Sequence, residues 1–333
     1  MKAKKKNKNN VWLASVLALL LSLTLTVPAS AKNLRVLSGF PKTHLFTEGC
    51  LGIFSENLKE ISGGKLVLQV SGPEVVPTNE QFQPVQAGVF DMLFTHPAYH
   101  LGATAMGASI EAVYPDPVKR RESGIIDYAD KHYNQIGIKL VAVLPITRYN
   151  IVLRDEIDDR NPSLNGLKIR TASLVAPAVK SLGGAPVNLP PGDIYTSLQK
   201  GVIDGFTLVA VGLKDYKIHE VANYLVRPKF AFISASIFMN FNKYNGLTDQ
   251  EKQWIEAAAV KSEKDSLAYF EMKHAEEVNE LKALGMKETQ LQPADAQKIE
   301  KVFTATIWTV AEKKSGQAIK DLHQLALDKG MTK

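Results

Sequence analysis

Short apolar runs rich in β-branched residues alternate along the chain with longer segments whose apolar positions recur every three or four residues. Runs of the first kind occupy residues 34–37, 65–70 and 89–94, and we predict strands there. Segments of the second kind occupy residues 47–61 and 79–88, and we predict helices there. Such an alternation of strand and helix is typical of an α/β protein with a largely parallel sheet.

The same alternation returns in the second half of the chain. Pro145 interrupts an apolar stretch, and we predict separate strands on its two sides because proline removes a donor from a strand ladder. The long β-rich segment 230–240 suits a crossing back between two lobes. The predicted strands of this half are 139–144, 149–153, 167–170 and 205–209, and the predicted helices are 120–136, 175–182 and 193–200.

The last third of the chain is predicted to be helical. Thr248 and Glu251 have the spacing of a capping box, and residues 251–284 contain neither glycine nor proline. A helix of that length extends about 50 Å at 1.5 Å per residue, which is long enough to span two lobes. Further helices are predicted at 293–314 and 317–329.

The excess positive charge is concentrated at the start of the chain. The formal net charge is +6 and the isoelectric point about 9.1. Residues 1–31 contain no acidic residue, so their removal leaves a nearly neutral chain. We therefore expect no nucleic-acid partner. The lysines of this segment are Lys2, Lys4, Lys5, Lys6 and Lys8.

The basic start has the layout of a secretory signal peptide. The apolar stretch 11–27 follows it, and the small residues Ala29-Ser30-Ala31 come next. An uncleaved membrane anchor is the alternative, because the apolar stretch approaches the length of about 20 residues that spans a bilayer. No later segment is apolar over that length, so we expect no membrane span in the cleaved protein.

Cleavage after this signal predicts a defined N-terminus. Mass spectrometry of the exported protein should show Lys32 as the first residue, because the small-residue rule is met directly before it. An intact Met1 on membrane-bound material would contradict cleavage.

Sequence motifs give no support to catalysis. The chain has no P-loop, no dinucleotide-binding glycine motif, no H-E-x-x-H and no G-x-S-x-G, so we expect neither an enzyme nor a cofactor. The single cysteine, Cys50, can form no intramolecular disulfide and is interpreted as a buried small apolar residue. His96 and His100 stand four residues apart but lack a further ligand nearby, so we expect loop or pocket histidines and no metal site.

Three groups of motifs carry a resemblance to a known family. They are ISGGKL at 61–66 with VQAGVFDM at 85–92, then LNGLKIR at 164–170, then IYTSLQKGVIDG at 194–205. Their order and spacing resemble the extracytoplasmic solute-binding subunits of tripartite ATP-independent periplasmic (TRAP) transporters, a dicarboxylate-binding-protein-like family. The resemblance covers most of the mature chain.

The resemblance implies a bilobal periplasmic-binding-protein fold of the α/β class, with two lobes joined by hinge strands and a long lobe-spanning helix. Residues 32–146 plus about 234–274 are expected to form lobe I. Residues 147–233 plus about 275–333 are expected to form lobe II with the C-terminal helices. The implied function is capture of a small organic acid in the periplasm and its delivery to the membrane subunits of a TRAP transporter.

Two arginines are candidates for ligand binding. Arg170 is predicted to end a strand at the mouth of an α/β sheet, where ligands of such sheets bind, and its guanidinium matches a carboxylate bidentately. The resemblance implies that Arg170 is the family's carboxylate clamp, and a surface ion pair is the alternative. Arg148 lies before the strand that opens lobe II, where similar proteins often carry a second ligand-facing arginine; its alternative is a hinge hydrogen-bond donor.

Position in the family also suggests pocket-wall residues. Phe94 and His96 lie where the chain leaves the predicted strand that follows Gly88, and Phe206 and Leu208 lie on the strand after Asp204. Relatives that bind polyhydroxylated acids place a polar group where this chain has Leu208. We therefore predict a compact monocarboxylate with an apolar or aromatic body, and rejection of hydroxyl-rich acids, because a buried hydroxyl without a partner costs about 1 to 3 kcal/mol.

Two other functions stay open at this stage. A periplasmic sensory module for a signalling partner would share the ligand capture and differ only in its partner. A secreted enzyme on a similar scaffold would use His96 and a carboxylate as acid and base, and turnover of the ligand would distinguish it from a binding protein.

Overall fold

The computed structural model of the chain describes residues 31–158 and 162–332. One ten-stranded sheet runs through it in the order β2-β1-β3-β9-β4-β7-β5-β6, with β8 against β4 and β10 against β8. The strands are β1 (Lys32–Ser38), β2 (Leu66–Ser71), β3 (Met92–Thr95), β4 (Ile138–Leu153), β5 (Lys168–Arg170), β6 (Ala185–Val187), β7 (Gly205–Val209), β8 (Tyr224–Arg227), β9 (Phe230–Asn240) and β10 (Lys287–Gln290).

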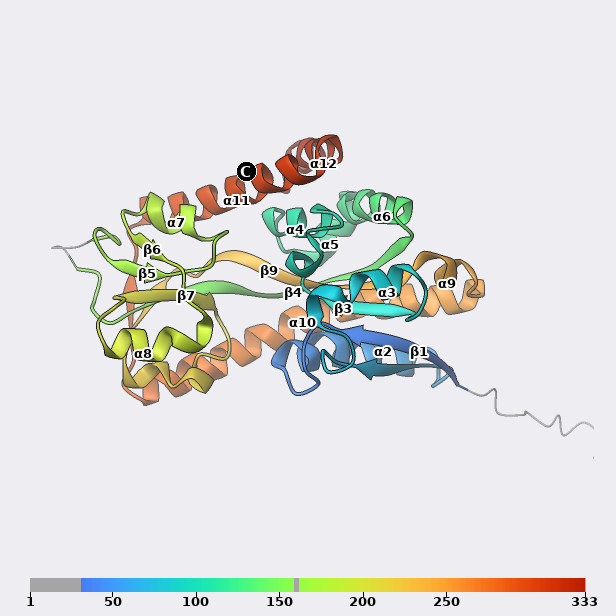
Figure 1. Cartoon of the computed structure of the whole chain (residues 1–333), viewed down its shortest axis with the longest axis horizontal. Coiled ribbons are helices and arrows are strands. Elements are labelled where there is room, and N and C mark those ends of the chain that lie inside the picture. The colour runs from blue at the N-terminus through green and yellow to red at the C-terminus, as the bar shows by residue number, and fades with distance from the viewer. Residues whose placement is uncertain (1–30, 159–161, 333) are drawn as a thin grey trace, which may run out of the picture.

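The two long strands β4 and β9 join two lobes, as Figure 1 shows. They pair antiparallel with each other, β3 pairs antiparallel with β9, and β7 pairs antiparallel with β4. β8 also pairs antiparallel with β4. The other pairs are parallel, namely β1 with β2 and β3, β5 with β6 and β7, and β8 with β10. The expected α/β bilobal class is confirmed, whereas the sheet is antiparallel wherever a pair includes β4 or β9.

The predicted break at Pro145 is wrong. Residues 139–144 and 149–153 belong to one continuous strand, β4. Pro145 lies opposite Ser234, and the pairing with β9 shifts register between Pro145 and Thr147. Because the ladder is irregular there, the strand passes through a residue that has no N–H to donate.

The predicted helices are present with two changes. Segment 120–136 is divided at Gly124, whose φ of 81° interrupts helical geometry. Segment 47–61 begins as a π-helical turn, η1, before α2. The α-helices are α2 (Ile53–Ile61), α3 (Phe82–Gln86), α4 (Met106–Ser109), α5 (Pro117–Glu122), α6 (Ile125–Gln135), α7 (Ala176–Ser181), α8 (Ile194–Gln199), α9 (Phe241–Asn245), α10 (Asp249–Ala283), α11 (Pro293–Ser315) and α12 (Gln317–Asp328).

Short 3-10 helices shape the loops between these elements. They are η2 (Thr78–Glu80), η3 (Pro97–His100), η4 (Ile110–Ala112), η5 (Pro191–Asp193), η6 (Lys214–Tyr216) and η7 (Ile218–Glu220), and the π-helical η1 is Thr47–Gly52. Two of these 3-10 helices border the candidate site: η3 directly follows β3, and η4 lies between α4 and α5.

The long helix α10 begins at the predicted capping box. The Thr248 side chain accepts from the Glu251 backbone N–H, and the Glu251 carboxylate accepts in return from the Thr248 backbone N–H. Figure 1 shows α10 running beneath both lobes. Its predicted span is confirmed, so a single helix links the lobes in addition to the two hinge strands.

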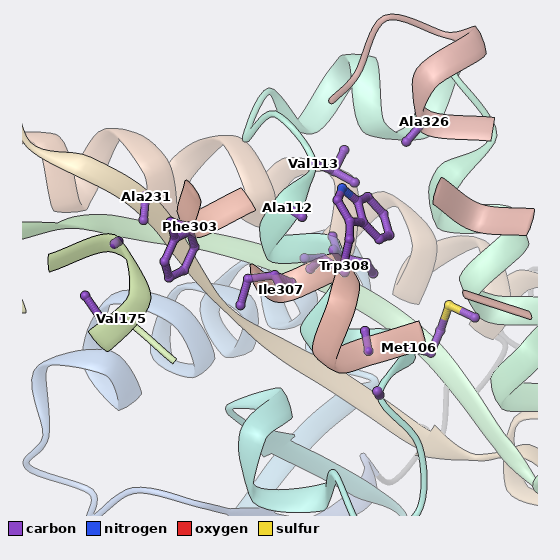
Figure 2. Packing of buried hydrophobic residues seen from close by; sticks show 14 of the residues in the cluster. Met106, Ala112, Val113, Val175, Ala231, Phe303, Ile307, Trp308 and Ala326 are labelled. Carbon is purple, nitrogen blue, oxygen red and sulfur yellow. The ribbon is translucent and has the colours of Figure 1, made fainter. Parts of the chain in front are cut away.

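A second helix, α11, also bridges the lobes on the opposite side of the sheet (Figure 1). It packs on α7 of one lobe and on α4 and η4 of the other. Figure 2 shows its side chains Phe303 near Ala231 and Trp308 near Val113, within one buried apolar cluster. Apolar packing therefore ties α11 to both lobes.

The division into lobes given above remains a prediction. Within it, α12 packs on α6, so the C-terminal helices reach back to the first lobe. The signal segment, except for Ala31, lies outside the described residues. Among residues that are described, none of the helices is both long and apolar enough to cross a membrane.

Candidate functional site

Arg170 is the last residue of β5 and is held by backbone carbonyl groups. It pairs with Phe206 of β7, its Nε donates to the Leu189 oxygen at 2.8 Å, and its Nη1 donates to the Thr207 oxygen at 3.2 Å. The residue is only 7% exposed. These two hydrogen bonds fix the guanidinium at the carboxyl end of the strand. A guanidinium has five N–H groups, so others remain to bind another acceptor.

No protein carboxylate neutralises this arginine. Throughout residues 31–158 and 162–332, no Asp or Glu lies within ion-pair distance of Arg170. Burial lowers the pKa of Arg170, and the neighbouring phenol groups of Tyr149 and Tyr216 oppose that shift only if they ionise. A buried cation held solely by neutral oxygens is complementary to an anionic ligand.

Tyr149 connects the surroundings of Arg170 with those of Glu111. Burial is the main cause of its raised pKa, the Glu111 charge raises it further, and the Arg170 charge lowers it. Its ring stacks on Phe230 at 5.9 Å between centroids. The Tyr149 side chain thus lies between a carboxylate from η4 and a guanidinium from β5.

Arg148 lies one residue before Tyr149 but is already paired. Its Nη1 lies 3.2 Å from Glu300 Oε1 on α11, and its guanidinium sits 5.6 Å from the Phe232 ring centroid. Glu300 also accepts from the Ala231 backbone N–H at 2.7 Å. The Arg148 pair and the Ala231 bond therefore fasten α11 to β4 and to the start of β9 in this arrangement.

A cavity of about 590 Å³ opens between the hinge strands, η4 and α11. Arg148 and Glu300 line one part of it, and Glu111 lines another. Apolar contributions come from Val113, Phe232 and Phe303. A volume of this size accommodates a small molecule.

His96 follows β3 and binds Glu111. Its Nδ1 accepts the Ala98 backbone N–H at 3.2 Å, so the ring proton is assigned to Nε2, which donates to Glu111 Oε1 at 2.9 Å. Glu111 also accepts from the Ser234 backbone N–H at 3.3 Å, and its side chain is 5% exposed. The predicted pocket residue His96 is thus joined to the cavity through Glu111.

His100 is a core histidine. Its Nε2 lies 2.9 Å from the Tyr133 hydroxyl, and its ring stacks on Phe82 at 4.8 Å. Burial, with a smaller effect of the His96 charge, lowers its pKa to about 3. The described residues contain no group of three or more His, Cys, Asp or Glu side chains arranged to hold a metal ion.

This burial predicts a loss of stability in acid. The unfolded chain protonates His100 below about pH 6.5, whereas the folded chain does so only near pH 3. The contribution of the neutral His100 to the unfolding free energy is therefore fully present above pH 6.5 and is lost as the pH falls. We expect His100 to account for about 2 kcal/mol of the decrease in unfolding free energy between pH 7 and pH 5. In urea unfolding, the unfolding free energy of His100→Gln should change less with pH than that of the wild-type protein. Equal pH dependence of the two proteins would contradict this role of His100.

The three remaining predicted wall residues lie in apolar clusters. Phe94 and Phe206 are fully buried, so neither presents a surface to a ligand in this arrangement. Leu208 is partly buried and packs against the cluster that contains Phe206. Thr207, on the opposite side of β7, donates to the Thr171 hydroxyl at 2.7 Å. We keep Leu208 as a proposed neighbour of the ligand and set aside Phe94 and Phe206, whose bulk supports the strands instead.

Several residues that border this region were not singled out from the sequence. Glu111 and Tyr149 lie in segments without a motif, and only the three-dimensional arrangement brings Tyr149 close enough for the charges of Glu111 and Arg170 to act on it. Phe40 and Tyr99 form an aromatic pair, with ring centroids 5.9 Å apart, at the carboxyl ends of β1 and β3. The rule that ligands bind outside the carboxyl ends of strands could have suggested these last two.

Cys50 has the structural role expected of it. It is fully buried, and burial raises the pKa of its thiol, which disfavours the reactive thiolate.

Comparisons with known proteins agree with this architecture. The family model for bacterial extracellular solute-binding proteins of family 7, DctP, matches residues 123–314. The ectoine-binding periplasmic protein TeaA of Halomonas elongata is 26% identical over 155 residues, which is 46% of this chain and 45% of TeaA. The chain thus spans about half the length of the curated relatives that it matches.

Solved structures extend the likeness to the whole fold. The apo structure of TeaA, the ectoine-binding protein of the TeaABC TRAP transporter, superposes with a TM-score of 0.75 at 19% identity, over 90% of this chain and 99% of TeaA. DctP7 of Bordetella pertussis, an extracytoplasmic solute receptor with pyroglutamic acid bound, gives 0.66 at 17% identity, over 89% of this chain and all of that chain's length (100%).

The family model covers more than half of the chain, and TRAP solute-binding proteins share its fold of two lobes joined by hinge strands. The chain therefore belongs to family 7 of the bacterial extracellular solute-binding proteins.

Proposed function

We propose that the protein captures a small organic carboxylate between its lobes and delivers it to the membrane subunits of a TRAP transporter. The observation that carries this proposal is the unpaired guanidinium of Arg170, buried at the carboxyl end of β5. In this role Arg170 binds the carboxylate through its remaining N–H groups. The planar fork of arginine suits a carboxylate better than the single ammonium of lysine.

Closure of the lobes completes the site. The hinge strands β4 and β9 absorb the movement, and the second lobe covers the ligand. Exclusion of water strengthens the ion pair with Arg170, so binding favours the closed shape. The membrane partner would then recognise the closed protein.

Arg148 is proposed as a second ligand-facing residue. Its pair with Glu300 is about one-third exposed on each side, so it can be rearranged at small cost. Release of Arg148 toward the ligand would loosen α11 from β9 and thereby link ligand binding to the hinge. Leu208 is proposed to face an apolar part of the ligand.

The similar proteins support a receptor of this kind. TeaA and UehA are periplasmic proteins named for binding ectoine, and DctP7 is described as binding pyroglutamic acid. We accordingly propose a periplasmic location after removal of the signal peptide, and a binding role without catalysis.

Native mass spectrometry of the protein, purified without denaturation from its own host, tests this function. We expect one small organic acid bound per chain, released unchanged after prolonged incubation. Conversion of the bound molecule would indicate an enzyme, and a bound molecule without a carboxylate would contradict the proposal.

A further inference from the structure

We propose that the ligand is amphoteric, with a carboxylate bound by Arg170 and a protonated or N–H-bearing nitrogen bound by Glu111. This inference rests on the proposed function and narrows its ligand class. It follows from a guanidinium and a carboxylate on the two sides of Tyr149, neither of which forms an ion pair with an Asp, Glu, Arg or Lys in the described part of the chain.

The negative charge is that of Glu111. Its side chain is 5% exposed and lines the 590 Å³ cavity. Its closest hydrogen-bond donors are His96 Nε2 at 2.9 Å and the Ser234 N–H at 3.3 Å. The imidazole of His96 accepts a backbone N–H at Nδ1 and donates from Nε2 to Glu111. The carboxylate is therefore hydrogen-bonded, but neither donor is an arginine or a lysine.

No arginine or lysine that borders this region pairs with Glu111. Arg120 is fully buried below η4 and donates to the oxygens of Tyr114 and Val113, each at 2.8 Å, and to that of Ile110. Burial lowers the pKa of Arg120, and the Glu111 charge, together with other carboxylates, opposes that shift from a distance; the two side chains form no ion pair. Arg148 is engaged by Glu300.

Lys229 also lines the cavity but lies among other charges. Burial lowers its pKa to about 8, with further lowering by Arg227 and Arg148 and an opposing effect of Glu271. Glu111 thus lines the cavity without an ion pair to an arginine or lysine of the described residues.

The positive charge is that of Arg170. Tyr149 lies between Pro145 and Ile151 on β4. Pro145 pairs with Ser234, whose N–H donates to Glu111, and Ile151 pairs with Thr207, whose oxygen accepts from Arg170. Both charges also act on the Tyr149 hydroxyl. They come from different lobes, since η4 precedes the hinge strand β4 and β5 follows it. Closure therefore brings the two charges toward the same enclosed ligand.

An enclosed ligand must satisfy both charges. A plain carboxylate would neutralise Arg170 but leave Glu111 desolvated without a direct ion-pair partner, which is unfavourable in a closed, water-poor site. A zwitterion neutralises both Arg170 and Glu111. An acid with a ring N–H neutralises Arg170 and donates a hydrogen bond to Glu111. The pair consequently selects amphoteric acids over plain acids of the same shape.

Isothermal titration calorimetry with matched probe pairs tests the selection. Each pair shares a ring and a carboxylate and differs in a basic nitrogen: proline against cyclopentanecarboxylate, and piperidine-2-carboxylate against cyclohexanecarboxylate. We expect the nitrogen-containing member of a bound pair to bind at least tenfold more tightly to the wild-type protein.

Glu111→Gln keeps the shape and an oxygen that can accept from Ser234, and removes the charge. It should weaken binding of the amphoteric probe at least tenfold and leave the affinity for the plain acid unchanged or higher. Glu48→Gln, at an exposed glutamate bonded to Tyr269, is the matched control and should change neither. Urea unfolding confirms that both variants are folded.

The outcomes separate the two proposals. Equal affinity within the pairs, or an amphoteric probe insensitive to Glu111→Gln, would overturn the inference while leaving carboxylate capture intact. Binding of none of the four acids, together with a non-carboxylate in the native mass spectrum, would overturn both.

Discussion

Replacing Arg170 by alanine is expected to weaken binding of the carboxylate identified by native mass spectrometry by at least tenfold. The substitution removes a charge-assisted bidentate contact inside a closing cleft, and such contacts contribute about 1.5 to 3 kcal/mol. Because 1.4 kcal/mol corresponds to a factor of ten, the expected loss is about 10-fold to 150-fold. Isothermal titration calorimetry measures it directly.

Two further variants make this result specific. Arg170→Lys should restore little affinity, because the ammonium keeps the charge but loses the fork that binds two oxygens. Arg35→Ala is the control, since Arg35 lies in the middle of β1 and its half-exposed side chain is paired with Asp91 at 3.6 Å. Near-normal affinity of a folded Arg170→Ala protein would refute the role of this arginine.

A large effect on stability is expected at the junction of α10 with lobe I. Arg121 Nε and Nη2 donate to the two oxygens of Glu263 at 2.6 and 2.9 Å, and Glu263 is 2% exposed. Glu263 also accepts the Val143 N–H at 3.0 Å, beside an irregular stretch of β4. Arg121→Ala should lower the unfolding free energy by about 3 to 5 kcal/mol at neutral pH, because it leaves a buried carboxylate unpaired.

The pH dependence of this defect has a defined sign. Burial raises the pKa of Glu263 and Arg121 opposes the shift, so removal of Arg121 raises that pKa further. The folded variant then holds a proton that the unfolded chain releases, and its stability falls as the pH rises above the usual Glu range. Urea unfolding should therefore show a smaller defect at pH 5 than at pH 8.

Lys273→Ala provides the control on the same helix. Lys273 and Glu276 form an exposed pair at 3.1 Å, and such pairs contribute about 0.5 kcal/mol or less. If Arg121→Ala lowered the unfolding free energy no more than Lys273→Ala does, the buried Glu263 carboxylate would not depend on its ion pair with Arg121.

Local signals in the sequence predicted the elements whose cause is local. The capping box at Thr248 marked the start of α10, because both of its hydrogen bonds join residues three apart. Glycine is another local signal for the end of a helix: Gly88 and Gly201 lie just beyond α3 and α8 and have φ values of 77° and 68°. Arg170 was placed correctly at a strand end, since a short apolar strand precedes it.

Features that depend on distant partners were missed. The course of β4 through Pro145 depends on an irregular pairing with β9, almost ninety residues later in the chain. The short strands β6, β8 and β10 have little apolar periodicity and form because an existing sheet offers them an edge.

The same limit applied to the candidate site. Nothing in the sequence around Glu111 indicates a buried carboxylate, because its donors His96 and Ser234 come from other segments. Phe94 and Phe206 were expected at the pocket wall, but alternation along a strand cannot distinguish a wall from a core when both faces are covered.

A crystal structure of the protein with its co-purified ligand tests the central claim, carboxylate capture by Arg170, most directly. We predict closed lobes and a ligand carboxylate oxygen about 2.7 to 2.9 Å from the Arg170 guanidinium nitrogens. A ligand bound away from Arg170, or one whose carboxylate is held by other residues alone, would contradict it.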